Sequence, residues 1–342
     1  MLYVTTRNEH DAYTAHRAIH SETGNDGGGF LPFRMPYFEQ EEIAALKEKT
    51  FGQCVSEMLN RFFSCGLTGW DVDFLAGRHA AKLRSLPHRV IAAELWHNVE
   101  GSYDHLEYAL ANRVCGADTK PNSWVRIAIR ISVLSGIYGM LLREGCISVS
   151  QPFDVAVPTG DFEIPMAVWY LRHMGFPVAN IICCCNDNST LWDLLQHGEM
   201  KTIVFPKKTV TPLMDQAIPE QLERLICATL GAKEACRYHD IRKDGGVYAP
   251  PVGTLETLRK GLQVSVVSDQ RIRSDIPNVY RTAGYLMGPY TALAYGGLTD
   301  HRSVSGLSRP ALLLADRSVL CDPGIVCQVM GCGMAGLNEL IR

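Results

Sequence analysis

The pattern of apolar and polar positions along the chain predicts alternating strands and helices. Short apolar runs predict buried strands, and stretches with apolar residues three or four positions apart predict helices. The expected strands are residues 2–6, 89–95, 153–157, 179–185 and 310–315. The expected helices are residues 39–49, 52–63, 103–114, 123–143, 162–174, 215–230, 254–261, 269–283, 289–297 and 324–330. This alternation predicts an α/β fold.

The middle of the chain carries the clearest unit of that pattern. Residues 153–157 predict a strand and residues 162–174 a helix, with Pro165 in the first turn, where proline is tolerated. A second strand follows at residues 179–185. A strand, a crossover helix and a second strand give parallel neighbours with a right-handed connection. We therefore expect a parallel sheet with flanking helices.

Composition and charge narrow the classes of protein that the chain can represent. Its 342 residues are 46% hydrophobic and 20% charged, which suits a large globular core. The 33 basic and 36 acidic residues give a net charge of −3, so no excess of basic residues favours nucleic acid. The first residues lack a basic segment followed by an apolar one, and no apolar run reaches the length of a membrane span. We expect a cytoplasmic protein that binds neither nucleic acid nor membranes.

The twelve cysteines follow no disulfide or metal-binding pattern. None of them forms a CxxC pair, and the adjacent thiols of residues 183–185 could bridge only with strain. We therefore expect buried, reduced cysteines. An alternative is a nucleophilic cysteine at the end of the strand 179–185, activated by a histidine such as His97.

Short motifs spread over most of the chain carry a family resemblance. They are residues 3–7 (YVTTR), 26–32 (DGGGFLP), 94–97 (ELWH), 122–123 (NS), 157–162 (VPTGDF), 174–177 (MGFP), 186–188 (NDN), 211–215 (TPLMD), 223–224 (ER) and 285–292 (YLMGPYTA). In this order they resemble the motifs of the threonine synthase family, whose members depend on pyridoxal phosphate (PLP) and have fold type II.

The resemblance implies the large domain of fold type II enzymes with the small domain mostly missing. The family's SGDTG motif and the small domain that it opens have no counterpart between residues 114 and 122. We expect residues 1–90 to resemble the family's N-terminal region and residues 91–342 to form the α/β domain. Such a loss would remove one wall of the family's cleft.

The family's Schiff-base lysine has no counterpart in the chain. Aligning residues 94–97 with the family's ELFHGPTxAFKD places Asp104 at the lysine position, and no lysine occurs between Lys82 and Lys120. A carboxylate cannot form the aldimine that PLP chemistry needs. The alignment therefore predicts a degenerate family member without the family's chemistry.

The resemblance also implies a vestigial cofactor site and a vestigial substrate motif. The phosphate loop would consist of Thr159, Gly160, Asp161, Phe162 and Glu163. Its two carboxylates would face a phosphate dianion, which costs free energy through like-charge repulsion. The substrate motif keeps Asn122 and Ser123, while Val125 and Ala128 replace its second asparagine and its arginine. We expect no bound cofactor, since PLP is implied by resemblance only.

Polar residues near the missing lysine offer other chemistry. His97, Asp104 and His105 are candidates for an acid, a base or a nucleophile. Histidines and carboxylates also bind metals, but Asp104 and His105 are neighbours that point apart on a helix. We therefore expect no metal site and favour a solvated helix face.

These observations lead to three hypotheses about function. The first is a threonine synthase-like protein that has lost PLP-dependent activity and acts as a non-catalytic binding or regulatory homologue. The alternatives are an enzyme with PLP-independent chemistry in the remnant cleft, and an active PLP lyase that uses an unexpected lysine. Loss of the small domain would expose apolar surface, which predicts a homodimer or a complex with another protein. A small-molecule ligand is an open alternative.

Overall fold

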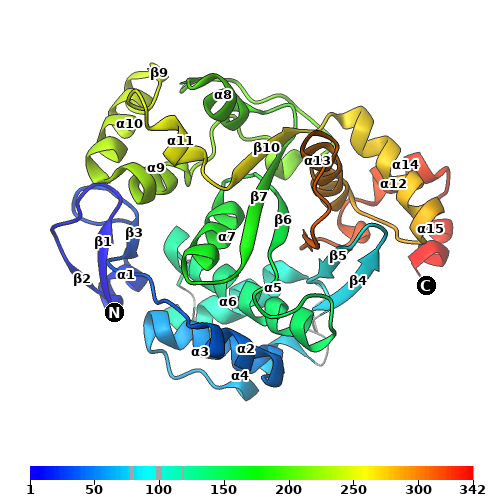
Figure 1. The fold of residues 1–342 in the computed structure, drawn as a ribbon, viewed down its shortest axis with the longest axis horizontal. Coiled ribbons are helices and arrows are strands. Elements are labelled where there is room, and N and C mark those ends of the chain that lie inside the picture. The colour runs from blue at the N-terminus through cyan, green and yellow to red at the C-terminus, as the bar shows by residue number, and fades with distance from the viewer. Residues whose placement is uncertain (78–80, 98–101, 118, 342) are drawn as a thin grey trace.

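A six-stranded sheet forms the centre of the computed structural model, which describes residues 1–77, 81–97, 102–117 and 119–341 (Figure 1). The strand order is β10-β7-β6-β11-β5-β4, and all neighbours are parallel except β4, which pairs antiparallel with β5. The strands are β4 (Lys82–Leu86), β5 (Val90–Glu94), β6 (Phe153–Pro158), β7 (Val178–Cys185), β10 (Leu262–Val266) and β11 (Ala311–Ala315). The predicted α/β fold with a mostly parallel sheet and flanking helices is confirmed.

Side chains of successive strand residues point to opposite faces of this sheet and belong to two separate apolar cores. In β11, Leu312 and Leu314 belong to one core, whereas Ala311 and Leu313 belong to the other. The first core is covered by α3 (Phe51–Phe63), α5 (Tyr103–Cys115), α6 (Ser123–Arg143) and α7 (Glu163–His173). The second is covered by α12 (Asp269–Ala283), α13 (Pro289–Ser305), α14 (Pro323–Met330) and α15 (Met334–Ile341).

The long helix α6 is the centre of the first core. Asn122 caps its N-terminus, because the Asn122 side chain accepts a hydrogen bond from the Val125 N–H at 3.0 Å. By length and hydropathy α6 could cross a membrane, but 83% of its most apolar stretch is buried inside the protein. The pair α14 and α15 passes the same test together and is bent by 90° at its break. Burial of α6 is typical of a core helix.

The remaining elements form two outer groups. The N-terminal group contains β1 (Leu2–Thr5), β2 (Tyr13–Thr14), α1 (Ala15–His20), β3 (Phe30–Pro32), α2 (Gln40–Ala45), η1 (Leu46–Glu48) and α4 (Gly69–Ala76). Strands β1, β2 and β3 form a separate antiparallel sheet in the order β2-β1-β3. The second group contains α8 (Thr190–His197), β8 (Met200–Lys201), η2 (Pro212–Met214), α9 (Leu222–Leu230), α10 (Ala232–Asp244), β9 (Val247–Tyr248) and α11 (Leu255–Arg259). A short 3-10 helix, η3 (Val319–Cys321), follows β11.

Several sequence-based boundaries differ from the structure. The helix expected at residues 215–230 begins only at Leu222, because Pro219 disfavours helical backbone in the residue before it. Helix α13 continues past residue 297 to Ser305. Strands β4 and β10 were not expected, since both are edge strands with several exposed residues. The domain boundary at residue 90 stays a prediction, and β4, which precedes it, belongs to the central sheet.

Candidate functional site

Four charged side chains form a closed cluster beside the carboxyl ends of the central strands. Arg126 and Arg130 lie one helical turn apart on α6, so both guanidinium groups point to the same side. The Arg126 Nε donates to Glu107 Oε1 at 3.1 Å, and the Arg130 Nε donates to Glu107 Oε2 at 2.9 Å. Both arginines also form ion pairs with Glu163, at 3.1 and 3.3 Å. We call Glu107, Arg126, Arg130 and Glu163 the charge cage.

The two carboxylates of the charge cage differ in their proton affinity. Both side chains are buried. For Glu163, burial dominates over the attraction of Arg130 and raises the pKa to about 7. For Glu107, burial acts in the same direction, but Arg130 and Arg126 together outweigh it and hold the pKa below its usual value. The cage therefore pairs opposite charges that come from three helices, α5, α6 and α7.

The predicted phosphate loop connects β6 to α7, and hydrogen bonds within the loop fix its conformation. Its backbone turns through a hydrogen bond from the Phe162 N–H to the Thr159 carbonyl at 2.8 Å. The N–H of Glu163, the first residue of α7, donates to the Asp161 carboxylate at 2.9 Å. Gly160 has a φ of +47°, which glycine adopts without strain. A carboxylate of the chain thus occupies a helix N-terminus, the position where anions bind in other proteins.

The position that the resemblance aligns with the family's lysine lies at the edge of this cluster. Asp104 is exposed in the first turn of α5 and pairs with Arg317 at 3.2 Å. Arg317 follows the end of β11, and burial raises the pKa of its neighbour Asp316. The adjacent His105 is exposed. The structure therefore brings Asp104 to a guanidinium group and not to His97.

The space enclosed beside the charge cage is small. A cavity of about 20 Å³ remains between Tyr103, Arg130, Leu95, Leu314 and Asp316. Ligand pockets for organic molecules have volumes of about 300 Å³ or more. In this arrangement the cavity has room for a water molecule but not for a cofactor.

The predicted substrate motif connects α6 to the N-terminal group. The Asn122 amide donates to the Ala18 and Ser21 carbonyls, each at 2.7 Å, while its oxygen caps α6. Ser123 accepts a hydrogen bond from Arg224 at 3.1 Å. Arg224 is almost fully buried and also donates to the Phe30 carbonyl. In this structure the two motif residues hold elements together.

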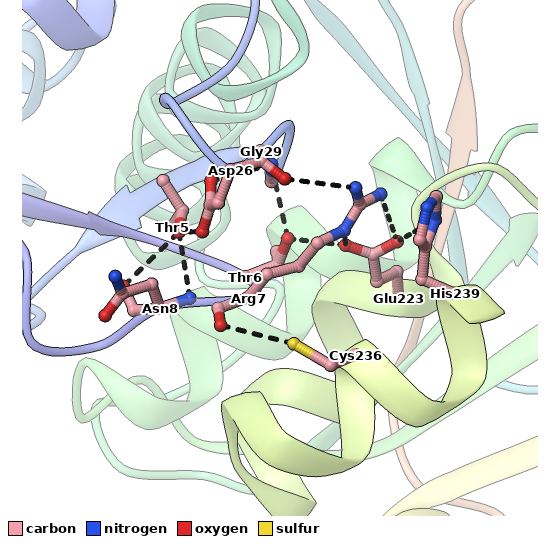
Figure 2. A network of polar contacts seen from close by, with 10 residues as sticks. Thr5, Thr6, Arg7, Asn8, Asp26, Gly29, Glu223, Cys236 and His239 are labelled. Atoms are coloured by element: carbon pink, nitrogen blue, oxygen red, sulfur yellow. Dashed lines mark hydrogen bonds and ion pairs between the residues drawn. The ribbon is translucent and has the colours of Figure 1, made fainter.

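The opening motif and the residues 223–224 meet in one polar network, which Figure 2 shows. The Arg7 guanidinium donates two hydrogen bonds to the Glu223 carboxylate, at 2.9 and 3.0 Å. The Thr6 hydroxyl donates to the same carboxylate at 2.6 Å, and His239 lies 3.8 Å from it. The Cys236 thiol donates to the Arg7 carbonyl at 3.3 Å. Two motifs that are far apart in sequence thus fasten the N-terminal group to α9 and α10.

The other two candidate chemistries do not converge on the charge cage. The His97 Nε2 lies 2.6 Å from the Glu94 Oε2. Glu94 lies on the face of the sheet that carries the second core. The three adjacent cysteines are buried in β7, and burial raises the pKa of each thiol. Strands β6 and β11 separate β7 from β5, so the structure does not join these thiols to His97.

Sequence reasoning missed three members of the charge cage, Glu107, Arg126 and Arg130. The two arginines stand four positions apart in an otherwise apolar helix. Charged residues on a buried helix need partners, so two arginines at this spacing indicate a cluster of ion pairs. Within the described residues, no group of three or more histidine, cysteine, aspartate or glutamate side chains could hold a metal ion.

Comparison with known proteins relates this fold to one family. The family model "Threonine synthase N terminus" matches residues 2–72. Human "Threonine synthase-like 1" is 27% identical over 185 residues, covering 50% of this chain and 24% of that protein. "Threonine synthase" of Pseudomonas aeruginosa is 30% identical over 195 residues, covering 56% of this chain and 40% of that protein. The chain thus spans about a quarter of the length of the first curated relatives.

Solved structures show that the fold is shared. The PLP-bound threonine synthase from Brucella melitensis matches with a TM-score of 0.82 at 18% identity, covering 98% of this chain and 92% of that one. The threonine synthase from yeast matches with a TM-score of 0.79 at 14% identity, covering 97% and 90%. The chain thus shares the fold of threonine synthases and is similar to them in sequence over its N-terminal segment and about half of its length.

Proposed function

We propose that this chain is a threonine synthase-like protein that has lost PLP-dependent activity and acts as a non-catalytic binding or regulatory homologue. The observation that carries the proposal is the charge cage. Its two guanidinium groups hold both carboxylates in ion pairs beside the phosphate loop. Charged groups that pair with each other in this way, among the described residues of the cleft, support the loss of cofactor binding.

The residues of the cleft do not fit PLP. A phosphate dianion at the start of α7 would have to displace the Asp161 carboxylate from the Glu163 N–H. It would then lie beside two carboxyl groups, and like charges in close contact cost several kcal/mol at an effective dielectric constant of about 20. Asp104, at the aligned lysine position, has no amine to offer. The charge cage, the phosphate loop and Asp104 thus all support the proposed loss of the cofactor.

The cellular setting and assembly state are also proposals. Twelve free cysteines suit a reducing compartment, which supports a cytoplasmic protein. Exposed aromatic side chains on α4 and α5 support a homodimer or a complex with another protein. A regulatory homologue needs such a contact, because without catalysis its effect must pass through binding.

A PLP titration tests the loss of the cofactor. The purified chain is mixed with increasing PLP, the visible absorbance is recorded, and borohydride followed by peptide mapping locates any reduced lysine. We expect no saturable band, because Asp104 replaces the family's lysine and the Asp161 carboxylate occupies the Glu163 N–H at the start of α7. The urea-unfolded chain is the control, in which PLP labels lysines scattered over the sequence. A band that saturates at one PLP per chain and traps one lysine only in the folded protein would contradict the proposal.

A further inference from the structure

A second polar site lies on the opposite face of the sheet from the charge cage. It is a crevice of about 520 Å³ between the edge strand β4, the turn after α12, the residues after β11 and the end of α15. We call it the edge crevice and define it by Arg84, Glu94, His97, Tyr285, Leu340 and Ile341. Its volume falls in the range of pockets that bind small organic molecules, about 300–1,000 Å³.

Glu94 is the centre of the polar groups in the edge crevice. It is the last residue of β5, and its side chain is 7% exposed. Its Oε2 contacts the His97 Nε2 at 2.6 Å and accepts from the Arg84 Nε at 3.3 Å. Arg84 and Glu94 meet because both point to the same side of the antiparallel pair β4–β5. The buried carboxylate thus pairs with Arg84, contacts His97 and positions both of them.

Tyr285 supplies a buried hydroxyl that makes no well-aligned hydrogen bond among the described residues, although the Glu94 carboxylate lies close to it. Its side chain is more than nine-tenths buried and lines the crevice, yet its hydroxyl makes no hydrogen bond there. Burial, together with the nearby charge of Glu94, raises the pKa of Tyr285, so the hydroxyl keeps its proton. A buried donor without a well-aligned acceptor costs free energy. A ligand oxygen in the crevice would remove that cost.

The groups that line the crevice are richer in donors than in acceptors. A guanidinium group has five N–H donors, and the bond to Glu94 uses only the Nε of Arg84. Ser85 and Ser318 also line the crevice. Its apolar lining consists of residues such as Leu286, Val319, Leu340 and Ile341. Donors together with an apolar lining are suited to a carboxylate with an apolar body.

We propose that the edge crevice binds a small organic acid, whose carboxylate accepts from Arg84 and Tyr285 while its apolar body contacts the end of α15. The inference rests on the proposed function, because it names a ligand class for a non-catalytic binding protein. The two can fail separately, since PLP capture would occur in the cleft and acid binding on the other face of the sheet. Glu94 and His97 act here as positioning residues for Arg84.

Calorimetric titration with hexanoate tests this site, with hexanol as the neutral probe of the same length. We expect hexanoate to bind saturably at one site per chain and hexanol to bind at least tenfold more weakly. Arg84→Gln and Tyr285→Phe should each weaken hexanoate binding at least fivefold, whereas Arg281→Gln, an exposed arginine of α12, should leave it unchanged. Thermal melting verifies that each variant is folded.

Three results would overturn the inference. These are no saturable binding of hexanoate, equal binding of hexanol, or hexanoate binding that neither Arg84→Gln nor Tyr285→Phe weakens. Tyr285→Phe removes only a hydroxyl that makes no hydrogen bond among the described residues, so it should keep the fold intact. None of these results would contradict the proposed loss of PLP chemistry, because that proposal is tested by a visible absorbance band and a reduced lysine.

Discussion

At the scale of single residues, the charge cage contains two carboxyl groups that respond to pH in opposite ways. Burial raises the pKa of Glu163 from 4.5 to about 7, so the folded chain holds a proton that the unfolded chain releases. The stability that this group contributes is therefore present at low pH and is lost as pH rises through about 7. The pKa of Glu107 is lowered by the two arginines despite its burial, so its contribution is lost as pH falls.

Replacing Glu163 by glutamine should remove the first of these effects. Between about pH 5 and pH 8, the free energy of unfolding of the wild-type chain should fall by on the order of 3 kcal/mol through Glu163. In Glu163→Gln this fall should disappear, because glutamine has no proton to release. Urea unfolding at several pH values across that interval measures the difference in slope between the two proteins.

Glu107→Gln is the matched control from the same cage. It leaves Arg130 and the partly exposed Arg126 short of a carboxylate, so it should lower the free energy of unfolding at pH 7 by about 1–3 kcal/mol. Because the charge of Glu107 helps to raise the pKa of Glu163, this variant should reduce the fall between about pH 5 and pH 8 without abolishing it. If Glu163→Gln showed the wild-type slope, the carboxyl group of Glu163 would not be the group that titrates in this interval.

At the scale of elements, the start of α6 connects two parts of the chain through one side chain. Asn122 caps the helix with its oxygen and donates through its amide nitrogen to two carbonyls at the end of α1. Helix packing alone would not fix α1 at this place, since α1 has only six residues. The amide therefore sets the position of the N-terminal group relative to the first core.

Asn122→Ala should lower the free energy of unfolding by about 2–3 kcal/mol. The lost cap accounts for about 1 kcal/mol and the unsatisfied carbonyls for the remainder. Chemical unfolding measures the total, and hydrogen exchange of the amides of residues 15–21 should increase in the variant. The matched control is Ser189→Ala, because Ser189 precedes α8 without making a side-chain cap bond. A loss no larger than that of Ser189→Ala would contradict this role of Asn122.

At the scale of the whole molecule, the central sheet could be predicted because its strands are buried on both faces. Residues 311–315, for example, are all buried, and a continuous apolar run in the sequence predicts such a strand. Strand β10 escaped prediction because it lies at the sheet edge, where only Leu262 is buried. The charge cage could not be predicted as a unit, since its members come from three helices and meet only through packing. Single altered motif positions, such as Asp161 and Glu163, were visible in the sequence because each could be compared with a known pattern.

The proposed association with a second copy has a candidate contact surface in three exposed aromatic residues. Trp70 and Phe74 on α4 stack at 5.4 Å between ring centroids and are 72% and 65% exposed. Helix α4 packs beside α5, where Tyr108 is also half exposed. Helix α5 ends just before the place where the resemblance locates the missing small domain. We call Trp70, Phe74 and Tyr108 the aromatic patch, and aromatic residues are enriched in protein interfaces.

If the aromatic patch forms the dimer contact, the double change Trp70→Ser and Phe74→Ser should weaken dimerisation at least tenfold. Truncation of central aromatic residues in an interface commonly costs 2 kcal/mol or more, whereas their loss from a solvated surface costs little. Sedimentation velocity over a range of concentrations measures the dissociation constant. The control is Val252→Ser, because Val252 is fully exposed and is not part of the patch. A wild-type chain that stays monomeric at high concentration, or a dimer that the double change leaves intact, would rule out this surface as the contact between copies.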